Sequence, residues 1–127
     1  MDGRPNPQDD ALATDETPEL ISAGKVVGTA VYNRKAELLG SIYGLMLNKL
    51  NGRVAYAVMS FGGFLGIGDA YHPLPWKLLV YDTRLNGYVV DLDAGQLEAA
   101  PRYTDEPDWA ACGRGIDLYY GSLGFSV

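Results

Sequence analysis

Short runs of β-branched, aromatic and aliphatic residues alternate with glycine- and asparagine-containing turns from Leu20 onward. The runs at 25–32, 38–50 and 54–61 have the composition and length of strands. The second run also fits helical spacing, but Gly40 and Gly44 would each cost a helix about 1 kcal/mol relative to alanine. A bent strand, or one that another backbone approaches closely, tolerates glycine. The hydrophobic pattern therefore predicts a mainly β domain.

Two Asn-Gly pairs mark the predicted hairpin turns. Asn51-Gly52 precedes the strand at 54–61, and Asn86-Gly87 lies between two further predicted strands at 78–82 and 88–92. Asparagine and glycine accept the positive φ that tight antiparallel turns require. We therefore expect two antiparallel hairpins.

The predicted strand at 54–61 is apolar on both of its faces. One set of alternating positions holds Val54, Tyr56 and Val58, and the other holds Ala57, Met59 and Phe61. Successive side chains of a strand point to opposite faces of the sheet. One face should therefore meet the core, and the other should be covered by a helix, the C-terminal tail or a partner.

Helices are expected only after the last strand. Residues 93–100 should form a short helix with Asp93 as its N-cap and Gln96 as the capping-box partner. Residues 105–121 could form another, because an aspartate and a proline suit its start, although two interior glycines weaken this prediction.

Length and composition indicate one small domain with an acidic arm. The 127 residues, 47% of them hydrophobic, can build a single core, and sixteen Gly with nine Tyr favour a β protein over a helical bundle. Residues 1–20 hold six acidic side chains against Arg4 alone, a net charge of -5. Residues 1–19 also have almost no large apolar side chains and are predicted to be disordered.

Charge and cysteine content exclude several classes of function. Residues 21–100 carry seven basic and six acidic groups, a net +1 without the basic patch of a nucleic-acid-binding protein. Cys112 is the only cysteine, so an intrachain disulfide is impossible and a reducing compartment fits. No run approaches the ~18 apolar residues of a membrane span, and a signal peptide is not evident. We expect a soluble, cytoplasmic protein.

Catalytic and metal-binding patterns are weak. His72 is the only histidine and has no second histidine or cysteine nearby to share a metal. Ser60, His72 and Asp69 could be drawn as a triad, but no nucleophile elbow surrounds the serine. The glycines of 62–69 resemble a phosphate loop in composition, yet the following prolines forbid the helix that such a loop needs. We predict no enzyme activity, catalytic residue, cofactor or metal.

The order of short motifs resembles the PRC-barrel family. The loop Gly62-Gly63-Phe64-Leu65-Gly66-Ile67-Gly68 followed by Pro75-Trp76 is the most specific piece. The other motifs are Val31-Tyr32-Asn33, Leu39-Gly40-Ser41-Ile42, Asn51-Gly52-Arg53-Val54, Leu78, Leu97 and Ala100-Pro101. The resemblance implies a small, closed or partly open, six-stranded antiparallel barrel over residues 20–103, with one or two short helices after the last strand.

The family is named after the cytoplasmic domain of the photosynthetic reaction centre H subunit, and a relative forms part of a ribosome maturation factor that binds a small-subunit protein. The resemblance therefore implies a docking platform. Two positions depart from the family pattern. Ala36 stands where a glycine often completes the first hairpin turn, and Pro73 adds an unusual proline to the fourth strand. The first turn and the fourth strand are thus the weakest parts of the resemblance.

The expected function is non-catalytic protein binding, to an unidentified partner or to a second copy in a homodimer. The candidate contact residues are Gly62, Gly63, Phe64, Leu65, Gly66, Ile67, Trp76, Tyr119 and Tyr120. The large side chains among them either fill the core or form an exposed contact surface. Residues 104–127 are expected to pack on the barrel or on a partner. The alternatives are a ribosome- or RNA-associated assembly factor and a soluble partner of a membrane complex.

Overall fold

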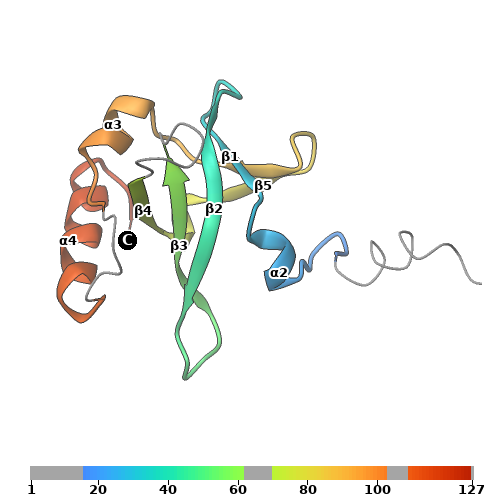
Figure 1. Ribbon diagram of the computed structural model, residues 1–127, viewed down its shortest axis with the longest axis horizontal. Coiled ribbons are helices and arrows are strands. Elements are labelled where there is room, and N and C mark those ends of the chain that lie inside the picture. The colour runs from blue at the N-terminus through green and yellow to red at the C-terminus, as the bar shows by residue number, and fades with distance from the viewer. Residues whose placement is uncertain (1–15, 62–69, 103–108, 127) are drawn as a thin grey trace, which may run out of the picture.

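A computed structural model describes residues 16–61, 70–102 and 109–126, and the six strands within these ranges form one sheet in the order β4-β3-β2-β1-β6-β5 (Figure 1). The elements are α2 (Ala23–Val26), β1 (Ala30–Tyr32), β2 (Leu38–Leu47), β3 (Val54–Phe61), β4 (Ala70–Pro75), the 3-10 helix η1 (Trp76–Leu78), β5 (Val80–Asp82), β6 (Gly87–Val89), α3 (Ala94–Ala99) and α4 (Trp109–Ser122). The prediction of a mainly β domain with six strands and later helices is confirmed.

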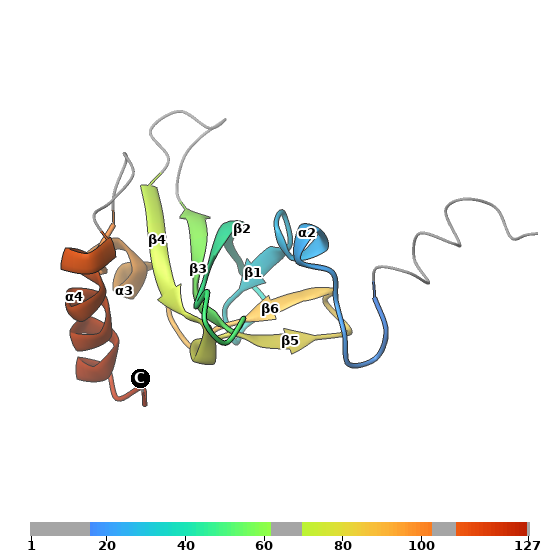
Figure 2. The same cartoon turned by 90° about the horizontal axis from the view of Figure 1, so that it is seen from below.

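The prediction of a closed or partly open antiparallel barrel is only partly right. Strands β1 and β6 run parallel, with Val31 opposite Tyr88, so the sheet is mixed. Strands β4 and β5 lie at opposite ends of the strand order, so the sheet is not closed into a barrel. Helices α3 and α4 stand beside β4, at one end of the sheet (Figure 2). Hairpin turns determine only local antiparallel pairs, whereas β1 and β6 are far apart in the sequence and meet through tertiary packing.

Both glycines of β2 serve the purposes expected of them in a strand. Gly40 lies where β3 comes close, because a Cβ at this position would lie 2.0 Å from the Ser60 carbonyl oxygen. Gly44 lies at a register shift between Ile42 and Gly44 in the β2–β3 pairing. The strand prediction for residues 38–50 is therefore confirmed over Leu38–Leu47.

The first predicted strand, over residues 25–32, is wrong over residues 25–29. The Ser22 side chain caps α2 by accepting a hydrogen bond from the Lys25 backbone N–H. Gly28 then adopts a φ of 92°, and β1 begins only at Ala30. A β-branched composition favours a strand, but this short cap and the glycine outweigh it.

The turn between β1 and β2 contains a strained residue. Ala36 has a φ of 62°, a left-handed conformation that costs a residue with a Cβ about 1–2 kcal/mol. The Asn33 side chain supports the turn by accepting hydrogen bonds from the Lys35 and Glu37 backbone N–H groups, each at 2.9 Å. The resemblance to the PRC-barrel family implied a glycine at this position.

Strand β4 carries two prolines without breaking the sheet. Pro73 and Pro75 pair with Val58 and Tyr56 of β3, and β4 lies at the edge of the sheet. An edge strand tolerates proline because one of its sides needs no backbone donor.

The core joins the sheet to the two later helices. Its buried cluster includes Val31, Ile42, Ala57, Met59, Leu74, Val90, Leu97, Ile116 and Tyr120. Helix α3 begins with the predicted capping box, because Asp93 Oδ1 accepts from the Gln96 N–H at 2.8 Å and Gln96 Oε1 accepts from the Asp93 N–H at 3.0 Å. None of the helices within the described ranges is both long and apolar enough to span a lipid bilayer.

Candidate docking surface

Three adjacent strands of the sheet contain no Asp, Glu, Lys or Arg. These are β2, β3 and β4. Cross-strand pairing places Ile42, Met59 and His72 on the core face of these strands, and it places Ser41, Ser60 and Tyr71 on the opposite face. The outward side of three strands therefore lacks the charges that normally cover a solvated sheet.

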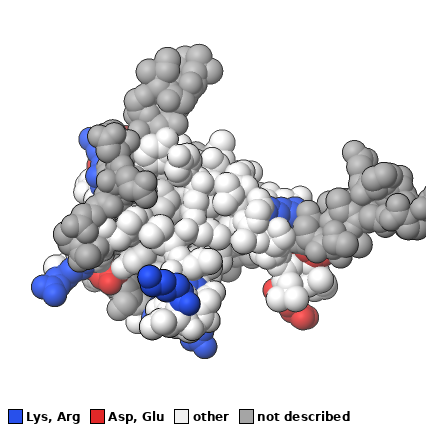
Figure 3. Space-filling model, turned by 60° about the horizontal axis from the view of Figure 1, so that its bottom comes forward, with Lys and Arg blue, Asp and Glu red and all other residues white. Residues whose placement is uncertain are grey.

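The open part of this outward side is aromatic and uncharged. Tyr43 is 60% exposed, and its ring lies 4.5 Å from that of Tyr71. Four outward residues, Ser41 and Tyr43 of β2, Ser60 of β3 and Tyr71 of β4, are together called the outer β2 face. Exposed leucines stand at both ends of β2 and on the hairpin beyond it, at positions Leu38, Leu47 and Leu50. Figure 3 shows a broad area of the molecule with few charged side chains.

Helix α4 occupies the other end of the same side. The Tyr56 hydroxyl donates a hydrogen bond to Asp117 Oδ1 at 3.0 Å, and the Tyr56 ring lies 5.6 Å from Trp109. Burial, together with the Asp117 carboxylate, raises the pKa of Tyr56 to about 12. One face of β3 thus meets the core, and α4 contacts the opposite face at Tyr56, whereas Tyr43 of the outer β2 face is exposed.

The predicted contact residues occupy different environments. Tyr120 is fully buried in the core, and the Tyr119 hydroxyl donates to the Gln96 carbonyl oxygen at 2.6 Å. These two tyrosines thus fasten α4 to α3 and the core. Trp76 is half-buried, and its ring lies 5.4 Å from that of Tyr88. The remaining predicted residues, Gly62, Gly63, Phe64, Leu65, Gly66 and Ile67, lie outside the described residues.

Tyr43 and Tyr71 were not predicted as contact residues. The available signal was an aromatic side chain at an outward position of a strand without charges. To use that signal, one must know which residues of β2 point outward. Simple alternation of inward and outward residues fails here, because the pairing of β2 with β3 is irregular between Ile42 and Gly44.

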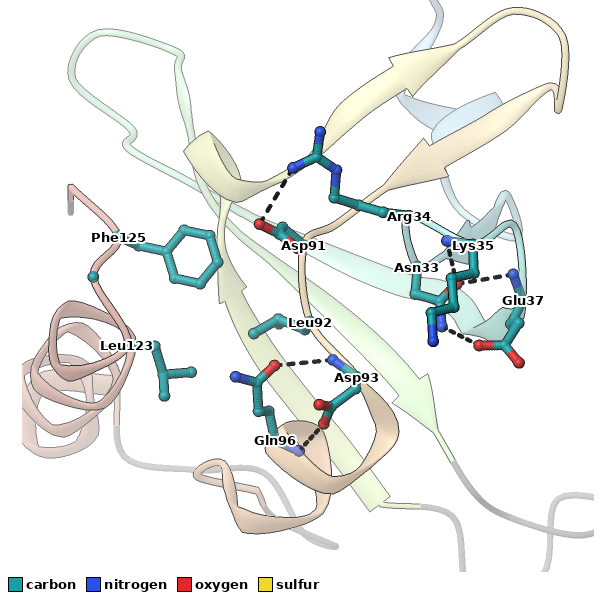
Figure 4. A pocket seen from close by; sticks show the side chains of 11 residues that line it. Asn33, Arg34, Lys35, Glu37, Asp91, Leu92, Asp93, Gln96, Leu123 and Phe125 are labelled. Carbon is teal, nitrogen blue, oxygen red and sulfur yellow. Dashed lines mark hydrogen bonds and ion pairs between the residues drawn. The ribbon is translucent and has the colours of Figure 1, made fainter.

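A hollow of about 490 Å³ lies where the β1–β2 turn, the segment before α3 and the tail after α4 come together (Figure 4). Its polar side chains mostly bind one another. Arg34 pairs with Asp91 at 3.5 Å, and Asn33 Nδ2 donates to Glu37 Oε1 at 2.7 Å. Leu123 and Phe125 of the tail complete the wall together with Leu92. The Arg34–Asp91 ion pair thus links the β1–β2 turn to the segment before α3, and the tail after α4 contributes apolar side chains to the wall.

His72 is buried and cannot act with Ser60. Its ring is 0% exposed, and neither of its nitrogens has a hydrogen-bond partner among the described residues. Burial and the positive charge of Arg102 lower the pKa of His72 to about 4. The nearby Pro101 carbonyl raises this pKa slightly, although it is not placed to accept a hydrogen bond from the ring. His72 pairs with Met59 and Ser60 with Tyr71, so the two side chains point to opposite faces of the sheet. Asp69 lies outside the described residues.

The chain thus forms a small β domain of the barrel-related class. It has a mixed, open sheet, two helices beside β4, and three adjacent strands, β2, β3 and β4, without charged residues. The model of the PRC-barrel domain family matches residues 18–97, and the chain therefore belongs to the PRC-barrel family. The resemblance seen in the sequence motifs is confirmed.

Solved structures provide a looser comparison. One match is a crystal structure from Pseudomonas aeruginosa, described as that of a 16S ribosomal RNA processing protein, RimM. The two chains are 24% identical with a TM-score of 0.40, and the match covers 65% of this chain and 49% of the other. This chain therefore matches about half the length of that protein. A comparison with curated proteins gave no match.

Proposed function

We propose that this PRC-barrel chain is a non-catalytic protein-binding module that associates with a second copy of itself through the outer β2 face. The observation that supports this function is the absence of charged residues from β2, β3 and β4, combined with the ring contact between the exposed Tyr43 and the half-buried Tyr71. Contiguous uncharged and apolar surface on a small domain marks an interaction site. Tyrosine also provides a large contact area for few rotatable bonds.

A second copy suits this surface for electrostatic reasons. A two-fold interface brings the same patch of both subunits together, so a charged patch would meet like charges. The outer β2 face has no charged side chain, and this repulsion does not arise. Strand β2 is already paired with β1 and β3, so the contact would join sheet faces rather than add a strand.

The glycine loop remains part of the proposal. Residues 62–69 connect β3 to β4, the two strands that carry Ser60 and Tyr71 of the outer β2 face. Phe64, Leu65 and Ile67 would extend the same apolar contact. A stable interface buries roughly 800 Å² on each partner, which is more than two tyrosines and two serines supply, so a contribution from neighbouring residues is required.

Light scattering coupled to size exclusion tests this function. The wild-type chain of 13.7 kDa should elute with about twice that mass at high micromolar concentration. Tyr43→Arg places a charge in the interface and should return the monomer. Val80→Arg is the matched control, because Val80 is 66% exposed on β5 and away from the outer β2 face.

Each result has a defined consequence, provided that thermal melting shows all three proteins to be folded. A wild-type chain that stays monomeric overturns self-association, and co-sedimentation with ribosomal subunits would then test the assembly-factor alternative. A dimer that is disrupted equally by both arginine substitutions would place the interface elsewhere.

A further inference from the structure

A separate cavity of about 410 Å³ opens between the N-terminal segment 16–21 and the part of the sheet formed by η1, β5 and β6. Its volume lies within the range of small-molecule sites. The described residues that line it include three aromatic rings, those of Trp76, Tyr81 and Tyr88. The cavity shares no residue with the outer β2 face, so its use does not depend on self-association.

The three rings form a floor with two walls. Tyr88 is 4% exposed and lies deepest, whereas Trp76 and Tyr81 are only partly buried. The Trp76 ring is inclined at 61° to that of Tyr88 with centroids 5.4 Å apart, and the Tyr81 ring at 73° with centroids 5.1 Å apart. Aromatic faces carry negative electrostatic potential, and several steeply inclined rings around one space attract an organic cation.

The charged groups of the cavity have a single sign. Glu16 and Glu19 contribute carboxylates to the lining, and none of the described residues that line the cavity is Lys, Arg or His. The hydrogen bond from Lys25 lowers the pKa of Glu16, so this carboxylate is ionised at neutral pH. The Lys25 ammonium lies 2.7 Å from Glu16 Oε1. An ammonium group thus already binds at the edge of the cavity, although Lys25 itself is not among the lining residues.

We propose that this cavity binds a small organic cation with a methylated ammonium group. Methyl groups can contact the rings together with Ile21 and Leu79, while the positive charge faces the ring surfaces and Glu16. A primary ammonium such as that of Lys25 is strongly hydrated and stays at the Glu16 carboxylate, whereas a quaternary ammonium gives up its water more easily. An anionic ligand would meet two carboxylates in the same lining.

Tryptophan fluorescence tests the proposal. The chain has two tryptophans, so Trp109→Phe leaves Trp76 as the only indole reporter. Tetramethylammonium and choline should each change its emission in a saturable manner. The neutral isostere 3,3-dimethylbutan-1-ol has the shape of choline without its charge and should bind about tenfold more weakly, since a desolvated cation–π contact is worth that much. Equal binding of choline and its neutral isostere, or no saturable change with any of them, would overturn the proposal.

Three substitutions in the Trp109→Phe protein separate recognition from structure. Tyr81→Leu removes one wall and should weaken choline binding about tenfold, whereas Val80→Ala, next to it but outside the lining, should leave binding unchanged. Lys25→Met frees Glu16 from its internal partner and should strengthen binding. A merely structural role for the Glu16–Lys25 pair predicts the reverse, so weaker binding by Lys25→Met contradicts the proposal.

Two binding experiments distinguish a free cation from a lipid headgroup as the source of the methylated ammonium. Choline in solution tests a free small molecule, and flotation with phosphatidylcholine vesicles, against phosphatidylglycerol vesicles as control, tests a lipid headgroup. Binding in either arm supports recognition of a methylated ammonium and identifies its source. Failure in both arms overturns the proposal and leaves the self-association through the outer β2 face untouched.

Discussion

His72 should make the stability of this domain depend on pH in a way that a single substitution abolishes. The ring is fully buried, and burial with the Arg102 charge lowers its pKa from 6.5 to about 4. In the unfolded chain the imidazole titrates at its ordinary value, so the unfolded state binds more protons between these two pH values. Stability therefore falls as the pH drops from 6.5 towards 4, and the full contribution of the neutral ring is present above pH 6.5.

The magnitude follows from the width of that window. Each pH unit between the two pKa values costs about 1.4 kcal/mol of unfolding free energy. At pH 5, about 1.5 units below the unfolded pKa, the loss assigned to His72 is therefore about 2 kcal/mol. This is a large share of the 5–15 kcal/mol that a typical domain possesses, roughly a seventh to two fifths.

The assay is urea unfolding followed by circular dichroism at pH 7.5, 6.5 and 5, for the wild type and His72→Leu. Carboxylates titrate in both proteins, so the difference between the two curves isolates His72. The leucine variant should be no less stable at pH 7.5, because neither ring nitrogen has a hydrogen-bond partner to lose among the described residues. It should then gain about 2 kcal/mol on the wild type by pH 5. A difference that stays constant across the three pH values would refute the reasoning.

Four further substitutions test the fold by the same unfolding measurement. Ala36→Gly should stabilise by about 0.5–1 kcal/mol, because glycine adopts the φ of 62° without the Cβ penalty, and a destabilised variant would contradict this. Gly40→Ala should cost 2 kcal/mol or more, on the order of severe overpacking, because the new Cβ would clash with a carbonyl 2.0 Å away. Gly44→Ala in the same strand has no neighbour within 4 Å and should stay within about 0.5 kcal/mol, so equal effects would be inconsistent with the β2–β3 register. Tyr56→Phe should cost about 1 kcal/mol by removing the hydrogen bond to Asp117, and an unchanged free energy would mean that this bond does not hold α4.

Local chemistry made part of the fold predictable. Asn86 adopts a φ of 52° and Gly52 a φ of 77°, as the two hairpin turns required. The Asp93–Gln96 capping box forms in both directions, because its geometry depends on residues three apart. Ala36, with a φ of 62°, lies where the resemblance to the PRC-barrel family implied a glycine.

Features that depend on distant contacts could not be read in the same way. The parallel pairing of Val31 with Tyr88 joins segments from opposite ends of the domain, and no local signal specifies it. Residues 25–28 have a strand-like composition, yet the Ser22 cap and Gly28 decide their structure. The Tyr43–Tyr71 pair depends on the irregular register of β2, so the sequence offered Trp76, Tyr119 and Tyr120 as contact residues instead.

The central claim is that the outer β2 face is buried when two copies meet, and hydroxyl-radical footprinting of the wild-type chain at low and high concentration tests it most directly. Mass spectrometry would compare the oxidation rate of Tyr43 with that of Leu118, which is 67% exposed on α4. We predict that the oxidation rate of Tyr43 falls several-fold at the concentration where the mass doubles, while that of Leu118 stays constant. A doubled mass with an unchanged oxidation rate at Tyr43 would contradict the account.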